Sequence, residues 1–223
     1  MAKDQSYVLG VLTKEQLEHS LFPLGKAANK DDIRAEAKAR ELSVAQKPDS
    51  YDICFIPEGD TRDWLSDKID RADGAIVDLD GNQLGTHDGA IGFTVGQRKG
   101  LNIGKPAADG KPRYVLSIRP KDNVVVVGPD EALLISELSG SKYSWCGEAP
   151  SNTTDWFDAE VQVRAHGLSH PCRVKVAENL LVISLTEPIR GVSPGQTAVV
   201  YLGSRVLGQA TIDKTVSAVM EQV

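Results

Sequence analysis

The stretch Thr197-Ala-Val-Val-Tyr-Leu202, then Gly203-Ser204, then Arg205-Val-Leu-Gly-Gln-Ala-Thr-Ile212 decides the fold class of this chain. Two runs rich in β-branched residues, separated by a two-residue turn with glycine, are typical of a β-hairpin. Four similar runs precede this hairpin, with glycine and proline at the corners, at residues 132–138, 158–165, 171–177 and 180–186. We therefore predict a six-stranded antiparallel β-barrel over residues 129–223, in which residues 141–157 form a long connection.

Residues 58–128 are predicted to form a small α+β central domain. A hairpin is expected around Asp80-Gly81, between the runs 75–79 and 82–84, because glycine supplies the positive φ that tight hairpin turns need. Two further strands, 114–118 and 124–127, are expected to pair with each other. Trp64, Leu65 and Ile69 indicate a short helix before them.

Residues 1–57 are predicted to be helical with a closing strand. Thr13 and Gln16 form a capping-box pattern ahead of a helix that continues to Leu21, and Asn29 is a cap for a second helix that continues to Leu42. The apolar run at 53–56 predicts a buried strand. Two modest helices and one strand are too little for a closed core. We therefore expect the end of an α/β domain, and a chain that is a fragment of a longer protein.

The composition is ordinary for a globular protein, with 41% hydrophobic and 25% charged residues among 223. No apolar run approaches the ~20 residues of a membrane span, so no membrane partner is expected. The three cysteines are widely spaced, which argues against a disulfide scaffold and fits a reducing cytoplasm. His166, His170 and Cys172 lack a fourth ligand, and no metal site is predicted.

Basic residues are concentrated in the middle of the chain, although the net charge is −6. Between Arg98 and Lys121 there are seven basic residues and one acid, Asp109. Such a local excess attracts phosphate whatever the total charge. Arg98 and Lys99, flanked by glycines, are the best phosphate-binding candidates. The alternative is a solvated loop balanced by nearby acids such as Asp78, Asp80 and Asp88.

Cys54 is the candidate for chemistry. It lies in the run Ile53-Cys-Phe-Ile56 and follows the polar residues Asp49, Ser50 and Asp52. Taken alone, it is better interpreted as a core residue, because free cysteine is among the most buried residue types.

Six blocks, in order, carry a resemblance to a known family. They are Lys3-Asp-Gln-Ser-Tyr7, Phe22-Pro-Leu-Gly25, Asp49-Ser50 with Ile53-Cys-Phe-Ile56, Gly85-Thr-His-Asp-Gly89, Thr94-Val-Gly-Gln-Arg-Lys-Gly-Leu101 and Pro194-Gly-Gln-Thr-Ala-Val-Val-Tyr201. Together they resemble the tRNA-specific 2-thiouridylase family, in the part after its nucleotide-binding region. The match extends from Lys3 to about Asp213.

The resemblance implies an α/β ATP-pyrophosphatase domain that ends at about residue 57. The family's Ser-Gly-Gly-x-Asp-Ser phosphate loop and first catalytic cysteine do not occur in this sequence. ATP is therefore expected to be bound by the missing region, and the fragment alone is expected to be inactive.

The resemblance also implies roles for individual residues. Cys54 corresponds to the cysteine that carries a persulfide. Lys3, Asp4, Gln5, Arg164 and Gln196 correspond to positions that contact tRNA. The family has an aromatic residue after the arginine, and this chain has Ala165 there.

The implied activity is 2-thiolation of the wobble uridine of tRNA, by ATP-dependent adenylation and persulfide sulfur transfer. Its implied partners are tRNA and a sulfur-donor protein, either a cysteine desulfurase or a sulfur-relay protein. The alternative is a non-catalytic RNA-binding module.

Overall fold

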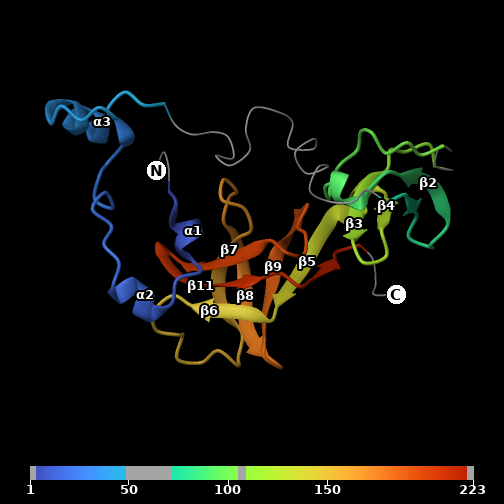
Figure 1. Cartoon of the computed structure of the whole chain (residues 1–223). Coiled ribbons are helices and arrows are strands. Elements are labelled where there is room, and N and C mark those ends of the chain that lie inside the picture. Colours follow the sequence, from blue (N-terminus) through green and yellow to red (C-terminus); the bar gives the residue numbers. More distant parts are fainter. Residues whose placement is uncertain (1–3, 49–71, 105–108, 220–223) are drawn as a thin grey trace.

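The computed structural model describes residues 4–48, 72–104 and 109–219, and over these ranges the protein is mostly β. Helices α1 to α3 lie on one side of the view, and two hydrogen-bonded sheets make up the rest (Figure 1). No helix within the described ranges is long and apolar enough to cross a membrane. The predicted strand at 53–56 and the predicted helix around Trp64 lie outside these ranges.

The central part of the chain forms a four-stranded sheet in the order β2-β1-β4-β3. Its strands are β1 (Gly74–Val77), β2 (Gln83–His87), β3 (Tyr114–Arg119) and β4 (Val124–Gly128). Both predicted hairpins are confirmed, since β1 pairs antiparallel with β2 and β3 with β4. Gly81 has a φ of 84°, as the predicted Asp80-Gly81 turn requires. The parallel pairing of β1 with β4 was not predicted.

A small core lies against this sheet. Ile76, Val115, Val125 and Val127 are fully buried there, and Phe93 packs against them from the loop after the short 3-10 helix η1 (Ala90–Gly92). Asn123, in the β3–β4 turn, adopts a positive φ of 52°. Its side-chain amide donates to the Ala72 and Asp73 carbonyls at 2.8 and 3.0 Å, and its oxygen accepts from the Ala90 amide at 3.2 Å. One side chain thus connects three loops.

The last part of the chain forms an eight-stranded sheet in the order β12-β5-β9-β8-β7-β10-β11-β6. Its strands are β5 (Leu134–Gly140), β6 (Lys142–Trp145), β7 (Phe157–Gln162), β8 (His170–Ala177), β9 (Leu180–Arg190), β10 (Thr197–Leu202), β11 (Arg205–Thr211) and β12 (Lys214–Ser217). β10 has the predicted bounds, and the Gly203-Ser204 hairpin is confirmed. The sheet contains eight strands where six were expected. The expectation that residues 141–157 are all connection is wrong, because β6 lies within them.

The two extra strands continue neighbouring ones. β6 follows β5 after one residue and pairs with β11, whereas β12 follows β11 after two residues and pairs with β5. Tyr143 and Trp145 of β6 pack against the core, and Gly208 lets the β6 backbone approach β11 closely. Long-range pairing of this kind leaves little trace in a short local pattern.

The predicted start of the strand at residue 132 is also wrong. Residues Asp130–Leu133 form a 3-10 helix, η2, and β5 begins only at Leu134. The Ala132 amide donates to the Pro129 carbonyl at 3.2 Å, which turns the chain before the strand begins.

Helix α2 (Lys14–Glu18) begins as predicted but ends early. Thr13 and Gln16 make both hydrogen bonds of the capping box. Instead of continuing to Leu21, the helix stops at Glu18, where the Ser20 hydroxyl donates to the Gln16 carbonyl at 2.6 Å. The Ser20 hydroxyl thus donates to a carbonyl that a backbone amide of the next helical turn would otherwise bind.

Helix α3 (Lys30–Ala39) is capped by Asn29, whose side chain accepts from the Asp32 amide at 2.9 Å. It does not reach Leu42, because Glu41 adopts a left-handed φ of 55°. The Leu42 amide then donates to the Ala37 carbonyl and the Glu41 amide to the Lys38 carbonyl, which is a Schellman ending. Glycine is the usual residue at this position, so the glutamate in the sequence did not indicate that the helix ends here.

Helix α1 (Ser6–Leu9) was not predicted, and two of its side chains contact β10. The Tyr7 hydroxyl donates to the Thr197 carbonyl at 2.8 Å, and Ser6 Oγ lies 3.3 Å from the Tyr201 hydroxyl. A Cβ on Gly10 would lie 2.9 Å from Val199. The beginning of the described chain is therefore attached to the middle of the eight-stranded sheet.

We expect Gly140→Ala to destabilise the protein. A Cβ at this position would lie 2.0 Å from the Thr211 carbonyl oxygen, so backbone must move. The free energy of unfolding should fall by about 1–3 kcal/mol, as in other overpacked sites. Urea unfolding measures it.

Gly104→Ala is the matched control, because a Cβ there has no heavy atom within 4 Å. It should change the free energy of unfolding by less than about 0.5 kcal/mol. Equal stability of the two variants would contradict the close approach of β5 and β11.

Candidate nucleic-acid interface

Of the eight residues that the sequence singles out, six lie in the described ranges. Lys3 and Cys54 lie outside them. The other six are Asp4, Gln5, Arg98, Lys99, Arg164 and Gln196, and they come from four separate loops or termini of the fold.

Asp4 and Gln5 are exposed and begin helix α1. The Asp4 carboxylate accepts from the Ser6 amide at 2.7 Å, and this hydrogen bond lowers the pKa of Asp4. Gln5 is the N-cap residue, and its side chain makes no capping hydrogen bond. Asp4 therefore has a local role in starting the helix, whereas the Gln5 amide is available to a partner.

Arg98 and Lys99 lie at the tip of a tight loop. Gln97 closes it, because its side chain accepts from the Thr94 amide at 3.1 Å and donates to the Lys99 carbonyl at 2.9 Å. Gly96 and Gly100 have φ values of 88° and 75°, which only glycine adopts without strain. The loop thereby holds two cations side by side and exposed.

The charges around these cations are unevenly compensated. Arg113 pairs with Asp109 at 3.1 Å and Lys111 with Glu131 at 3.5 Å. Within the described part of the chain, no ion pair involves Arg98, Lys99, Arg119 or Lys121. Asp78, which the alternative interpretation assigned to balancing them, instead accepts hydrogen bonds from the Asp80 and Asn82 amides and from the Asn82 side chain.

Arg164 follows β7 instead of lying on a strand as predicted, because β7 ends at Gln162. The Gln162 side chain donates to the Arg164 carbonyl at 2.8 Å, and the Gly167 amide donates to the same oxygen at 2.9 Å. These bonds close a turn. The Arg164 guanidinium then donates to the carbonyl oxygen of Gly191, 27 residues away.

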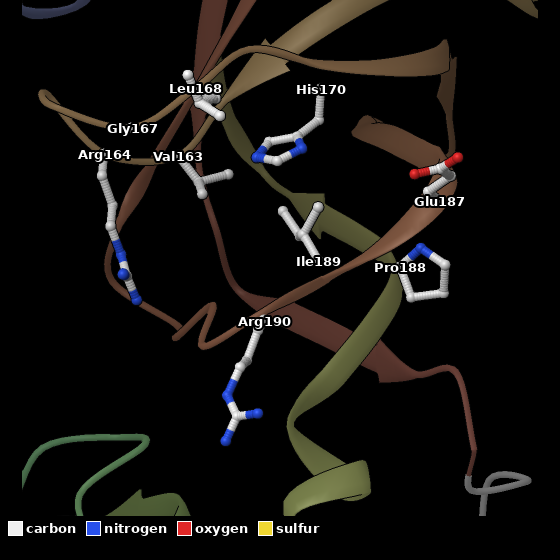
Figure 2. Close-up of a pocket in the computed structure, with 9 residues that line it drawn as sticks. All are labelled: Val163, Arg164, Gly167, Leu168, His170, Glu187, Pro188, Ile189 and Arg190. Atoms are coloured by element: carbon white, nitrogen blue, oxygen red, sulfur yellow. The ribbon is translucent and has the colours of Figure 1, made fainter.

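Arg164 lines an open hollow of about 350 Å³ (Figure 2). Arg190, His170 and Glu187 line it too, and Ile189 points into it between them (Figure 2). Arg190 makes a bidentate ion pair with Asp130 and lies 5.4 Å from the Tyr114 ring centroid, and its hydrogen bonds lower the pKa of Asp130. The charge of Arg190 is therefore compensated, whereas Arg164 has no acidic partner in the described ranges.

Gln196 closes the turn that leads into β10. Its side-chain oxygen accepts from the Ser193 amide at 3.1 Å, and Gly195 has a φ of 87°. The Gly195 amide donates to the Ile212 carbonyl and the Ile212 amide to the Gln196 carbonyl, both at 2.8 Å. The Gln196 side-chain NH₂ has no hydrogen-bond partner among the described residues and remains available to an acceptor.

The segment 191–197, here called the linking segment, brings three predicted positions together. Arg164 binds its first residue, and Gln196 lies near its end. Ser193 and Pro194 line a second hollow together with Thr94, which begins the loop that bears Arg98 and Lys99. The arrangement offers exposed cations and a free amide on the linking segment and the elements that adjoin it, which suits a phosphate backbone with polar contacts between the charges.

Asp4 and Gln5 are connected to the linking segment by contacts that the next residues, Ser6 and Tyr7, make with β10 and its first residue. The Tyr7 hydroxyl reaches Thr197 at the end of the linking segment, whereas Ser6 contacts Tyr201, four residues further along the strand. Sequence order gives no indication of this proximity.

His87 is a structural residue. It is 93% buried, its Nδ1 accepts from the Gly89 amide at 3.0 Å, and its ring lies 5.3 Å from the ring of Phe93. A Cβ on Gly74 would lie 2.5 Å from the imidazole, which therefore fills the space that glycine leaves on the paired strand.

The remaining histidines and cysteines form no cluster suited to a metal ion, as far as the described residues extend. Cys172 faces the core of the eight-stranded sheet, and burial raises its pKa to about 12. Cys146 is also buried, its pKa is raised for the same reason, and its thiol donates weakly to the Leu9 carbonyl at 3.9 Å.

Sequence reasoning gave no role to Trp156. Its ring is partly exposed, with Lys175 Nζ at 4.7 Å and Arg173 Cζ at 5.5 Å from its centroid. Arg173 and Lys175 are two residues apart on β8, so the sequence predicts that they share one face of the strand. Their contact with Trp156 depends on the pairing of β7 with β8, which the sequence does not show. Trp156 precedes the strand whose far end leads to Arg164, so the two sites are well separated.

Comparison with known proteins identifies three matching family models. Residues 1–58 match the tRNA methyl transferase HUP domain, residues 62–129 the tRNA methyl transferase PRC-barrel domain, and residues 135–212 the aminomethyltransferase beta-barrel domain.

Similar proteins described as tRNA-specific 2-thiouridylase MnmA occur in several bacteria. The one from Clavibacter michiganensis subsp. michiganensis is 61% identical over 222 residues, which cover 98% of this chain and 57% of that protein. The one from Leifsonia xyli subsp. xyli is 60% identical, with 98% and 60% covered, and the one from Renibacterium salmoninarum is 59% identical, also with 98% and 60% covered. The chain thus spans less than two thirds of the length of these relatives.

We expect Cys172 to resist alkylation in the folded protein. With a pKa near 12 its thiolate is scarce at pH 8, so iodoacetamide should react on the order of 10³-fold more slowly than in urea. Peptide mass spectrometry after timed quenching gives the rate at each cysteine. Cys146 serves as the internal comparison and should also react more slowly than in urea, and an unchanged rate at Cys172 would contradict its burial.

Proposed function

The chain belongs to the tRNA-specific 2-thiouridylase family, and from this premise we propose that it is the tRNA-holding and sulfur-carrying part of such an enzyme. The enzyme would 2-thiolate the wobble uridine of tRNA. The observation that carries the proposal is the 61% identity over 98% of the chain. The available cations Arg98, Lys99 and Arg164 support it independently, because contacts to phosphate need charges that the protein has not already compensated.

In this proposal Cys54 carries the sulfur. The Cys54 thiolate attacks the outer sulfur of a persulfide on a donor protein, either a cysteine desulfurase or a sulfur-relay protein, and the donor's own cysteine leaves as a thiolate. The uridine C2 oxygen attacks ATP, pyrophosphate leaves and an adenylate forms; the outer sulfur of the Cys54 persulfide then bonds to C2, and AMP leaves. A second cysteine attacks the persulfide during the transfer and releases the outer sulfur, so that both cysteines end as a disulfide.

ATP would be bound by a region of the enzyme that this sequence does not contain. No Ser-Gly-Gly-x-Asp-Ser loop occurs in the 223 residues. The match to the HUP domain model extends only over residues 1–58. The 223-residue chain alone is therefore proposed to be inactive in thiolation, and the complete enzyme to act in the cytoplasm.

The tRNA would be bound by Arg98, Lys99, Arg164 and Gln196, with Lys3, Asp4 and Gln5 at a second contact. Arg98 and Lys99 supply charge from a loop that Gln97 stiffens, and such preorganisation lowers the entropic cost of binding. Gln196 offers its amide NH₂, which suits a base edge or a sugar oxygen.

Three structural units would divide these tasks. We propose a remnant of the catalytic domain at 1–57, a central tRNA-binding domain at 58–128 and a C-terminal barrel at 129–223. Two separate hydrophobic cores, within residues 76–127 and 135–212, support the second boundary. A six-stranded barrel follows if β5 with β6, and β11 with β12, each count as one bent strand.

The alternative, a non-catalytic RNA-binding module, is supported by the same available cations. Both candidates predict tRNA binding, and only the first predicts that a longer form of the protein transfers sulfur.

We expect tRNA binding to weaken with salt. If five or six phosphates are neutralised, the slope of log affinity against log salt is about −4 to −5. The double variant Arg98→Ala, Lys99→Ala should make this slope shallower by ~1 to 2. Filter binding with unmodified tRNA across a salt series measures it.

The matched control is Lys142→Ala with Lys214→Ala, which removes the same charge from β6 and β12. It should leave the slope unchanged. An equal effect of both double variants would mean that only the net charge matters and would contradict a local site.

We expect the 223-residue chain to form no 2-thiouridine when it is incubated with ATP, a sulfur donor and unmodified tRNA. In a full-length relative, changing the cysteine that corresponds to Cys54 to serine should abolish product and leave tRNA binding intact. Nucleoside analysis by mass spectrometry detects the product. Thiolation by the short chain, or by the serine variant, would refute these roles.

A further inference from the structure

A hollow of about 630 Å³ lies between the central part of the chain and the linking segment. Its walls are mainly apolar, from Ile91, Phe93, Ile118, Pro120 and Pro194. The volume is within the range of sites that bind small organic groups. No interaction described above for Arg98, Lys99, Arg164 or Gln196 uses it.

The hollow is held in shape by Asn123. Its three hydrogen bonds to Ala72, Asp73 and Ala90 fix the β3–β4 turn against the two loops that form one end of the cavity. Asn123 also adopts a positive φ, a backbone conformation that persists only where the surrounding structure stabilises it. We therefore attribute the cavity to specific hydrogen bonds of the central part and not to loose packing.

Polar groups occur at defined places in the apolar wall. Thr94, Ser117 and Ser193 line the hollow from three different elements. Apolar faces with a few hydroxyl groups suit a flat heteroaromatic ring with polar edges better than a purely aliphatic chain.

Two cations lie at one edge of the hollow. Arg119 and Lys121 flank Pro120, both are exposed, and neither makes an ion pair within the described ranges. Three acids lie nearby, because Asp122, Asp73 and Asp88 are adjacent to the lining residues Asn123, Ala72 and Gly89. The two cations of the β3–β4 turn complement the phosphates beside a base that enters the apolar cavity.

Two candidate tRNA contacts also adjoin the hollow. Thr94 begins the loop with Arg98 and Lys99, and Pro194 lies two residues before Gln196. The hollow therefore lies beside both loops that are proposed to contact RNA.

We propose that this hollow binds one unpaired nucleobase of the tRNA, turned out of its stack. The base packs against Phe93 and Pro194, its edge hydrogen-bonds to the hydroxyl groups, and Arg119 and Lys121 contact the phosphates beside it. This inference rests on the proposed tRNA binding and adds a base-specific contact to it.

The test uses the 223-residue chain and unmodified tRNA transcripts, each with 2-aminopurine at one unpaired position. The fluorescence of 2-aminopurine changes when its stacking changes, so a base that enters the hollow reports itself. We expect one position, or two adjacent ones, to respond on binding.

Two variants close the hollow in different ways. Thr94→Trp fills it, while the backbone amide that binds Gln97 remains, and Ile91→Glu adds a negative charge at an exposed wall position. Each should abolish the fluorescence response and weaken binding about 5- to 100-fold, in line with the loss of one stacked base. Val219→Glu, at a similarly exposed position outside the hollow, should do neither.

The outcomes separate the two levels of inference. If tRNA does not bind the unaltered chain, both the proposed function and this inference fail. If tRNA binds with the expected salt slope but no position responds, or if both hollow variants bind like the unaltered chain, only the base pocket is overturned. Loss of self-association or of binding to the sulfur donor in these variants, with tRNA binding intact, would likewise overturn it in favour of a protein occupant.

Discussion

The hydrogen bonds that hold the linking segment are the constraint on which the candidate interface depends. The Arg164 guanidinium binds its first carbonyl, the Ile212 backbone fixes its last turn, and Tyr7 binds Thr197 where β10 begins. Four distant parts of the sequence therefore meet at one irregular strand connection. Ordering each free residue costs about 1–2 kcal/mol of conformational entropy. Because these hydrogen bonds already order the linking segment in the free protein, a ligand does not have to supply this free energy when it binds.

Charge pairing decides which cations remain for a partner. Asp109, Glu131 and Asp130 neutralise Arg113, Lys111 and Arg190, and these pairs lie around the same central region. Five cations have no acidic partner among the residues that the structure describes, namely Arg98, Lys99, Arg119, Lys121 and Arg164. The net charge of −6 is thus a poor guide, because a polyanion responds to the local field within about 10 Å.

Local rules recovered those parts of the fold that depend on neighbouring residues. The Thr13 and Asn29 caps, the Asp80-Gly81 turn and β10 were all readable, because each depends on a few adjacent residues. Elements that depend on a distant partner were not readable. β6 and β12 form because they pair with β11 and β5. Glu41 ends α3 in a left-handed conformation that a glutamate in the sequence does not indicate.

The candidate site divides in the same way. The Arg98-Lys99 loop could be identified from glycines and charges alone, whereas the bond from Arg164 to Gly191 joins residues 27 apart and needed the fold. The assignment of Arg164 to a strand was wrong, because the turn after β7 takes the residue off the ladder and lets its guanidinium reach across. A candidate contact residue can therefore be chosen from the sequence, whereas its neighbours in space require the fold.

The burial of two cysteines bears on the chemistry proposed for the third. Cys172 has a pKa near 12, so it holds no appreciable thiolate population near neutral pH, and burial also raises the pKa of Cys146. Persulfide transfer requires a thiolate, and the sequence contains one further cysteine, Cys54. In the proposed mechanism, burial therefore makes Cys172 and Cys146 poor candidates for the second thiol of the sulfur relay.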